Sequence, residues 1–425
     1  MRLTTRLLLP RRLAKARGSF DRARPQEYAA SLLPMIRARF GITRVADTTR
    51  LDRIGIPTVT AIVPSTADDL SVYGGKGLDK EQATLSAVFE AAERQVCATY
   101  SGPTYECSPD TIDDLLGLDN LGVVPAARTK PMLCVEGHDL VNGRVVPVPL
   151  GIVKCPWRHA AVSEIVSTNG LASGTSVAEA FYHALFEVVE RHLYSLTHIH
   201  AHVWPKFLFE RAHAYGLTFA DVSSDDPIAT EIMLPTNDSL VDTLLERIQQ
   251  AGLEVRLLAL TDAKLPLTVC ATIYERGENW GFSGFGCSWS PRHASVRAVT
   301  EAVQSRNVEI QGSREDLIRP DEVTDAVTQR AQSPERDHRG RWFFDGPASC
   351  VSSFRDLVDC SSADLMVELH ALIAALASVG YRSVVMVDLT PADSPVSVVR
   401  AIVPGLETHV IDQRFGSRTR RAFLG

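Results

Sequence analysis

Apolar residues recur at helical spacing in several long stretches of this 425-residue chain. The spacing predicts helices at residues 25–42, 80–100, 177–196, 290–310 and 362–380. Shorter runs rich in β-branched residues predict strands at residues 58–64, 145–153, 254–260, 267–274 and 383–389, with a closing segment at 398–407. Because helices and strands are mixed throughout, we expect an α/β or α+β fold.

Glycine-rich and polar stretches separate these elements. "GGKGLD" (74–79) is typical of a turn, and "STNGLASGTS" (167–176) is typical of a loop that ends in helix-capping residues. Residues 312–341 are polar and charged, so we expect a surface excursion there. The first 24 residues are basic and predict a solvated arm.

Composition excludes several classes of protein. With 45% hydrophobic and 22% charged residues, the chain can bury a large core. A net charge of −7 argues against a nucleic-acid binder, which would carry a basic face. No apolar run reaches the roughly 20 residues that span a bilayer, and no secretory signal is evident, so we expect a cytoplasmic protein with no membrane contact.

The eight cysteines are scattered and form no Cys-x-x-Cys pair. Cysteines in a chain of this length are mostly small buried hydrophobes, and none lies in the motifs described below. The sequence therefore identifies no catalytic nucleophile, and the catalytic residue stays unknown.

The most informative feature is a motif that occurs twice, as "FEAAER" (89–94) and as "FEVVER" (186–191), each time on a predicted helix. Helical spacing places carboxylates on one face of each helix, and the predicted helix at 290–310 carries a third polar row. The three rows are Ser86, Glu90 and Glu93; Glu179, His183, Glu187 and Glu190; and Arg297, Glu301 and Gln304.

Each row taken alone fits a solvated face with intrahelical ion pairs. Taken together, the Ala, Val and Leu content, the absence of lysine after Lys80 and the adjoining arginines favour burial of all three faces. Six buried carboxylates would repel one another, since two unit charges about 4 Å apart cost about 4 kcal/mol at an effective dielectric near 20. Arginines and Mg²⁺, which prefers oxygen ligands, would relieve this repulsion and fit a nucleoside triphosphate site.

Three long, ordered motifs resemble the YcaO superfamily of ATP-using enzymes. "GGKGLDKEQATLSAVFEAAER", "STNGLASGTSVAEAFYHALFEVVER" and "RAVTEAVQSR" are similar to its signature segments, and the resemblance covers about residues 60–405. It implies a YcaO-like fold of mixed sheets and helices around an ATP and magnesium site. The expected divisions are a basic arm (1–24), an N-terminal segment (25–65), a catalytic domain (66–408) and a C-terminal tail (409–425).

The resemblance also implies residue roles. Four glutamates match positions that hold magnesium: Glu90, Glu93, Glu187 and Glu190. Seven residues match positions around the nucleotide: Lys76, Ser86, Asn169, Glu179, Arg191, Arg297 and Glu301. One departure is His192, where the family usually has Asp after the second Glu-Arg.

Members of this family activate a peptide-backbone amide: a nucleophile adds to the amide carbon, the resulting oxyanion attacks the γ-phosphate of ATP, and phosphate then leaves. An adjacent Cys, Ser or Thr side chain as the nucleophile gives an azoline ring, and external sulfide gives a thioamide. This chain lacks the proline-rich tail of many azoline-forming members, and "FGITRVADTTRLDRIGIPT" (40–58) is similar to members that pair with a TfuA protein. We therefore expect thioamide formation on a peptide substrate with a TfuA-like partner, and a homodimer.

Two alternatives stay open from the sequence. One is a cyclodehydratase that forms thiazoline or oxazoline rings. The other is an ATP-binding accessory factor for ribosomal-protein methylthiolation. His183 lies on the acidic face of its predicted helix, where we expect it to support the site by hydrogen bonding rather than to take part directly.

Overall fold

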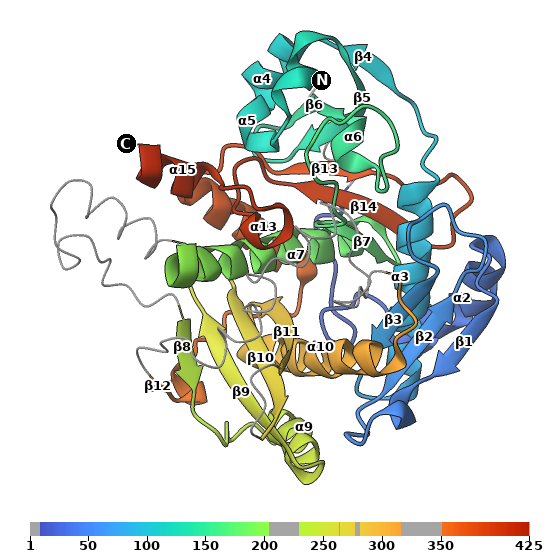
Figure 1. Ribbon diagram of the computed structural model, residues 1–425, viewed down its shortest axis with the longest axis vertical. Helices are drawn as coiled ribbons and strands as arrows, with labels where there is room; N and C mark the ends of the chain where they lie inside the picture. Colours follow the sequence, from blue (N-terminus) through green and yellow to red (C-terminus); the bar gives the residue numbers. More distant parts are fainter. Residues whose placement is uncertain (1–8, 204–228, 263, 277–280, 316–350, 425) are drawn as a thin grey trace, which may run out of the picture. The chain divides into compact units, whose positions relative to one another are not determined.

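The computed structural model describes residues 9–203, 229–262, 264–276, 281–315 and 351–424 (Figure 1). The chain falls into two compact units. Unit 1 comprises Met1–Val189, Asn307–Leu317 and Ser361–Gly425. Unit 2 comprises Glu190–Arg306 and Ile318–Cys360. The predicted boundaries after residues 24, 65 and 408 stay a prediction.

Unit 1 begins with a small antiparallel sheet covered by helices. Its strand order is β1-β2-β3, and α3 packs on β2 and β3 and contacts α2. The elements are α2 (Gln26–Arg39), β1 (Arg44–Asp47), η1 (Thr49–Leu51), β2 (Thr58–Ile62), β3 (Val72–Lys76) and α3 (Lys80–Ala98). Asp79 caps α3, because its side chain accepts a hydrogen bond from the Gln82 backbone nitrogen at 2.8 Å.

A second antiparallel sheet in unit 1 has the order β4-β5-β13-β14-β7, with β6 paired to β5. Its strands are β4 (Tyr105–Cys107), β5 (Met132–Asp139), β6 (Arg144–Pro149), β7 (Leu171–Gly174), β13 (Val385–Asp388) and β14 (Ser397–Ile402). The other helices that lie wholly or partly in unit 1 are α4 (Pro109–Leu116), α5 (Leu118–Leu121), η2 (Pro125–Thr129), α6 (Leu150–Val153), α7 (Val177–His198), α13 (Leu365–Ser378), α14 (His409–Asp412) and α15 (Ser417–Leu424). α7 continues into unit 2.

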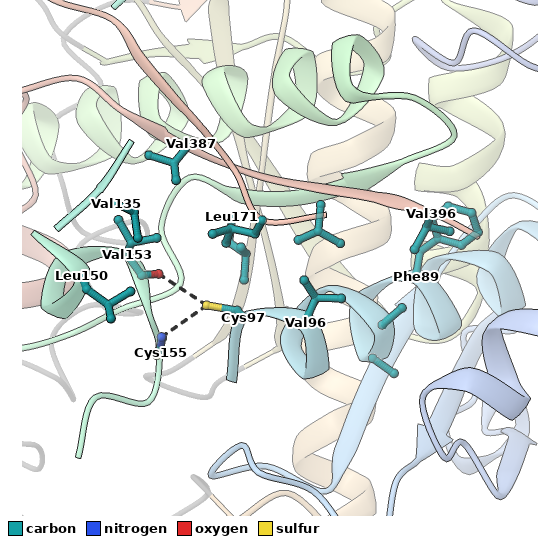
Figure 2. Packing of buried hydrophobic residues seen from close by; sticks show 14 of the residues in the cluster. Phe89, Val96, Cys97, Val135, Leu150, Val153, Cys155, Leu171, Val387 and Val396 are labelled. Atoms are coloured by element: carbon teal, nitrogen blue, oxygen red, sulfur yellow. Dashed lines mark hydrogen bonds between the residues drawn. The ribbon is translucent and has the colours of Figure 1, made fainter. Parts of the chain in front are cut away.

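The core of unit 1 joins α3 to this second sheet. Figure 2 shows Val96 and Cys97 of α3 packed among Leu150, Val153 and Leu171. The Cys97 thiol lies 3.4 Å from the Val153 carbonyl oxygen and accepts a hydrogen bond from the Cys155 backbone nitrogen at 3.2 Å. The core therefore fixes the position of α3.

Unit 2 is built on a five-stranded sheet with the order β11-β10-β9-β8-β12. All its pairings are antiparallel except the parallel pairing of β8 with β12. Its elements are η3 (Ile199–Val203), β8 (Ala229–Ile232), α9 (Ser239–Gln250), β9 (Leu253–Leu260), β10 (Leu267–Glu275), β11 (Gly281–Ser288), α10 (Pro291–Gln311), β12 (Val351–Ser352) and η6 (Phe354–Asp356). Mixed helices with mainly antiparallel sheets confirm the α+β class.

The structure corrects two predictions for glycine-rich segments. "GGKG" is not a turn: Gly74 to Lys76 complete strand β3. A Cβ on Gly75 would lie 2.2 Å from the Ala83 carbonyl oxygen, so the glycine lets α3 lie directly on the strand. The predicted loop at 167–176 likewise contains strand β7, which pairs with β14. Most of the predicted excursion at 312–341 lies outside the described residues.

The basic N-terminal segment packs against unit 1. The Nζ of Lys15 lies 2.6 Å from carboxylate oxygens of both Asp21 and Glu368. The Lys15 side chain is 10% exposed and that of Glu368 only 1%. The prediction of a solvated arm is therefore wrong for Lys15, which pairs with a buried carboxylate on α13. The arginines of the segment, Arg11, Arg12, Arg17, Arg22 and Arg24, are exposed as predicted.

Replacing Lys15 with Ala is expected to lower the free energy of unfolding by about 3 kcal/mol, because it removes the buried ammonium that lies 2.6 Å from the carboxylates of both Glu368 and Asp21. The matched control is Arg17→Ala on the same segment, where the side chain is exposed and the expected change is within about 0.5 kcal/mol. Urea denaturation measures both. Equal, small effects would show that the segment is solvated in solution.

In the described part of the chain, no helix is both long enough and apolar enough to cross a bilayer.

Candidate functional site

Helix α3 presents its polar row because its opposite face is made of small residues. Ala83, Ala87, Ala91 and Ala92 are fully buried. The polar positions Ser86, Glu90 and Glu93 are each half-buried. The glycines of β3 remove side chains beneath the helix, and the alanines fill the space. The same sequence that packs the helix therefore turns its carboxylates to one side.

Three carboxylates lie together in unit 1. Burial raises the pKa of Glu93 well above its usual value, and the charges of Glu187 and Glu90 raise it further. The Arg94 guanidinium and a hydrogen bond from Ser173 lower it, without reversing the shift. The structure thus brings Glu90 and Glu93 of α3 next to Glu187 of α7, as the sequence predicted, and the repulsion at Glu93 exceeds what Arg94 offsets.

Carboxylate oxygens with excess negative charge fit a hard divalent cation such as Mg²⁺. Among the described residues, however, no three His, Cys, Asp or Glu side chains stand in the geometry of a ligand shell. The glutamates are therefore gathered in one place, and their side chains would have to rotate to bind a metal.

The raised pKa of Glu93 gives a sign for the pH dependence of stability. A carboxyl group whose folded pKa lies above its unfolded value near 4.5 binds more protons when folded. Without metal, the stability that this group contributes is fully present below about pH 4.5 and is lost as the pH rises through the folded pKa. Urea midpoints measured across pH in EDTA should show this loss for the wild type and a weaker loss for Glu93→Gln.

Arg94 is held in place by Asp68. Its Nε and Nη2 lie 2.7 and 2.8 Å from the two Asp68 carboxylate oxygens, and its Nη1 lies 3.4 Å from the Thr168 hydroxyl. Asp68 is 6% exposed and also accepts from the Tyr73 hydroxyl at 3.1 Å. Burial lowers the pKa of Arg94, but Asp68 raises it above the usual value, so the arginine stays charged beside Glu93.

Glu179, expected near the nucleotide, is held by donors of unit 1. Its carboxylate accepts from the Thr175 hydroxyl at 2.9 Å and the Ala23 backbone nitrogen at 3.0 Å. The Arg22 guanidinium lies 3.3 Å away. Glu179 is 1% exposed, so here it ties the N-terminal segment to the start of α7.

The other predicted residues of unit 1 occupy different places. Lys76 is half-buried at the end of β3. Asn169 precedes β7, and its side-chain oxygen is buried without a hydrogen-bond partner in the described structure. His183 is 9% exposed and packs edge-on to Tyr182, with ring centroids 5.3 Å apart. The supporting role expected for His183 stays a prediction.

Unit 2 holds a second charged cluster. The Arg191 guanidinium lies 3.9 Å from Glu190 and 4.0 Å from Glu301, and it also lies over the Phe285 ring at 5.9 Å. Burial raises the pKa of the Cys270 thiol, and the charges of Glu301 and Glu190 raise it further. Three of the predicted residues are therefore neighbours in unit 2.

Helix α10 reaches this cluster by the same close packing as α3. A Cβ on Gly284 of β11 would lie 2.1 Å from the Ala302 backbone nitrogen. A Cβ on Gly286 would lie 2.6 Å from the Cβ of Arg297. Arg306, in contrast, pairs with Glu275 at 3.0 Å and stacks on the Phe282 ring. Arg306 therefore neutralises Glu275, a pairing that the sequence did not predict.

Two functional candidates were missed from the sequence, Asp68 and Arg400. Asp68 lies outside the three motifs, and only the structure shows that it positions Arg94. Arg400 is 4% exposed within the apolar strand β14, "SVVRAI". A charged residue inside a buried strand was the signal that could have identified it.

The α+β fold and the clustered glutamates and arginines define a protein suited to a metal-bound anionic ligand. The chain belongs to the YcaO family: residues 74–407 match the family model described as YcaO cyclodehydratase, ATP- and Mg²⁺-binding. This match confirms the resemblance seen in the motifs, and with it ATP and magnesium as cofactors. The chain is thus an enzyme of the ATP-dependent, cyclodehydratase-type YcaO family.

Two relatives cover nearly the whole chain. An uncharacterized protein from Methanothermobacter thermautotrophicus is 33% identical over 392 residues, which is 89% of this chain and 94% of the relative. A protein encoded in the tfuA 3′ region of Rhizobium leguminosarum bv. trifolii is 31% identical over 413 residues, covering 92% of this chain and 90% of the relative.

Solved structures support the fold. YcaO from Methanopyrus kandleri, bound with AMPPCP and Mg²⁺, superposes with a TM-score of 0.67 at 23% identity, covering 93% of this chain and 95% of that one. A heterocyclase in complex with substrate and cofactor gives a TM-score of 0.70 at 15% identity, covering 94% and 54%. Both comparisons confirm the YcaO-like fold.

Proposed function

We propose that the protein replaces the oxygen of a peptide-backbone amide with sulfur, in an ATP-dependent reaction that needs a TfuA-like partner. The observation that carries the enzymatic part is the cluster of Glu90, Glu93 and Glu187, whose excess charge suits Mg²⁺. A relative that matches nearly the full chain is encoded in the tfuA 3′ region, and this position beside tfuA supports thioamidation with a TfuA-like partner.

The reaction balances as an exchange of oxygen for sulfur. Sulfide adds to the amide carbon, and the carbonyl electron pair moves onto oxygen. ATP, bound with Mg²⁺, supplies the phosphoryl group that makes this oxygen a leaving group. The oxygen departs as inorganic phosphate, the sulfide proton ends on that phosphate, and ADP is released.

The residues of this chain have the following proposed roles. Glu90, Glu93, Glu187 and Glu190 would hold magnesium through carboxylate oxygens. Arg94, fixed by Asp68, would limit the repulsion among the glutamates of unit 1. The residues proposed around the nucleotide are Lys76, Ser86, Glu179, Arg191, Arg297 and Glu301. Glu179 would first have to release the donors that now hold it.

A second function, cyclodehydration to an azoline ring, is favoured by the family description and by the similarity to heterocyclases. In that reaction a Cys, Ser or Thr side chain of the peptide attacks the preceding amide carbon. The amide oxygen again leaves as phosphate. The same carboxylates would serve both reactions, so the nucleophile alone separates them.

The experiment that tests the proposal is mass spectrometry of a peptide substrate co-expressed with this protein and its genomic neighbours. Thioamidation exchanges one oxygen for one sulfur and so raises the peptide mass. Cyclodehydration removes one water and lowers it. An unmodified peptide with every neighbour, including a TfuA-like protein, would contradict both reactions and favour an accessory role.

The thioamide reaction is expected to stop when the TfuA-like partner is omitted, whereas nucleotide binding should persist. Modification at an undiminished rate without the partner would contradict this part of the proposal.

We also propose a homodimer. Size-exclusion chromatography with light scattering tests the homodimer and the complex with the partner.

A further inference from the structure

Unit 1 contains a cavity of about 350 Å³ that the magnesium proposal does not use. This volume falls within the roughly 300–1,000 Å³ of small-molecule sites. All residues that line the cavity belong to unit 1, and they come from the segment after α4, the segment before β7, strand β14 and the C-terminal helices. Its walls are partly apolar and include Ile152, Val188, Ile402 and Phe415.

Arg400 gives this cavity a buried positive charge. Its Nη2 donates to the Ser167 carbonyl oxygen at 2.6 Å, and its Nη1 lies 3.5 Å from the Val153 carbonyl oxygen. Its Nε is buried without a hydrogen-bond partner, and no carboxylate pairs with it among the described residues. A buried charge without a counter-ion is costly, so Arg400 is poised for an incoming group with negative charge.

The neighbouring Arg414 differs from Arg400 because its guanidinium has a carboxylate partner. Arg414 also lines the cavity, but its Nε donates to Asp412 at 2.7 Å and its Nη1 to the Leu121 carbonyl oxygen at 2.9 Å. Its charge is thus neutralised within unit 1. Within the described residues, Arg400 instead donates to carbonyl oxygens and to no carboxylate, which leaves its charge available to a ligand.

Asn169 supplies the complementary group. It lines the same cavity, and its side-chain oxygen is buried without a donor in the part of the chain that the structure describes. The cavity therefore offers one unused donor, the Arg400 Nε–H, and one unused acceptor, the Asn169 Oδ1. Both groups cost free energy until a ligand pairs them.

We propose that this cavity binds the peptide-backbone amide that reacts, with Arg400 donating to its carbonyl oxygen and Asn169 accepting from its N–H. This inference rests on the proposed function and names the binding site of its substrate. When the nucleophile adds, the carbonyl electron pair moves onto the oxygen beside the guanidinium. Arg400 then stabilises the oxyanion more strongly than it does the neutral amide.

An amide fits this donor and acceptor pair better than a phosphate does. A fully deprotonated phosphate, such as the terminal phosphate of metal-bound ATP, would satisfy Arg400 but has no proton to donate to Asn169 Oδ1. The sequence resemblance assigns Asn169 to the nucleotide, so the two assignments differ for this residue and can be tested against each other.

The experiment uses N-acetylglycine methylamide as a minimal amide probe, observed by saturation-transfer NMR with the full-length protein. We expect Arg400→Gln and Asn169→Ala each to weaken probe binding by about tenfold or more, since each removes one partner of a buried polar pair. Arg400→Lys keeps the charge and should retain part of the affinity. The control is Arg144→Gln, a half-buried arginine outside the cavity that should leave binding unchanged.

Three results would overturn the inference. Unchanged probe binding in Arg400→Gln would exclude the amide contact, provided that thermal unfolding shows a folded variant. Displacement of the probe by inorganic phosphate or by a non-hydrolysable ATP analogue would assign the cavity to the nucleotide. Loss of nucleotide affinity in Asn169→Ala with unchanged probe binding would do the same for Asn169.

The probe experiment is independent of turnover, so its outcome is distinguishable from failure of the proposed reaction. With a modified peptide in hand, Arg400→Gln should also lower kcat by about 100-fold or more, as for the loss of an oxyanion donor. The KM for ATP should stay unchanged. A raised KM for ATP with unchanged kcat would contradict the oxyanion role.

Discussion

Glu93→Gln is expected to reduce ATP-dependent turnover by at least about 100-fold while making the metal-free protein more stable. The loss of activity follows because the proposed magnesium site would lose a charged oxygen ligand at its most crowded position. The gain in stability follows because the neutral amide removes the repulsion with Glu187 and Glu90 that raises the pKa of Glu93. Turnover assays and thermal unfolding in EDTA measure the two effects.

Lower turnover together with higher stability distinguishes a metal ligand from a structural residue. The loss of a structural residue would lower both turnover and stability. The matched control is Glu81→Gln on the same helix, where the side chain is exposed and bonds only to Gln26. It should change neither turnover nor stability appreciably. A Glu93→Gln protein that is both active and no more stable would contradict the assignment.

Asp68→Ala is expected to be the most destabilising single substitution considered, at about 3–5 kcal/mol. It leaves the Arg94 guanidinium buried without the two oxygens that now lie 2.7 and 2.8 Å away. It also removes one acceptor of the Tyr73 hydroxyl, the Asp68 oxygen 3.1 Å away, and leaves the Leu70 carbonyl oxygen as another. Arg94 lowers the pKa of Glu93, so displacement of Arg94 should raise that pKa and favour the protonated form of Glu93. A protonated Glu93 is a poorer magnesium ligand, so nucleotide binding in the presence of Mg²⁺ should also weaken.

The control is the adjacent residue. Asp69 pairs with Arg158 at 2.7 Å, but both side chains are more than 60% exposed, so Asp69→Ala should cost less than about 1 kcal/mol. Chemical denaturation monitored by tryptophan fluorescence compares the two variants. Similar losses for Asp68→Ala and Asp69→Ala would show that the buried pair does not anchor Arg94.

The sequence predicted the long helices well because their periodicity is strong. Helices α3, α7 and α10 lie where apolar spacing placed them, and the carboxylates of α3 and Glu187 of α7 meet as expected. The glycine-rich segments were less predictable. β3 and β7 are strands because they pair with β2 and β14, and their glycines let helix backbones approach closely; both features depend on tertiary structure.

The remaining parts of the site depend on contacts between residues far apart in the chain. The pairing of Asp68 with Arg94 crosses 26 residues, and that of Lys15 with Glu368 crosses 353. No periodic pattern encodes such pairs, so the N-terminal segment was predicted as solvated although its lysine is buried. Arg400 stood out in the sequence only as a charge in a strand, and its buried Nε without a hydrogen-bond partner among the described residues could be seen only in the structure.

The central claim is that the glutamates of unit 1 hold the metal through which nucleotide binds. Isothermal titration calorimetry with a non-hydrolysable ATP analogue tests it most directly, with and without Mg²⁺, for the wild type and Glu93→Gln. The account predicts tight binding only for the wild type with Mg²⁺, and a loss of at least about tenfold in affinity when either the metal or the carboxylate is removed. Equal affinity under all four conditions would contradict it.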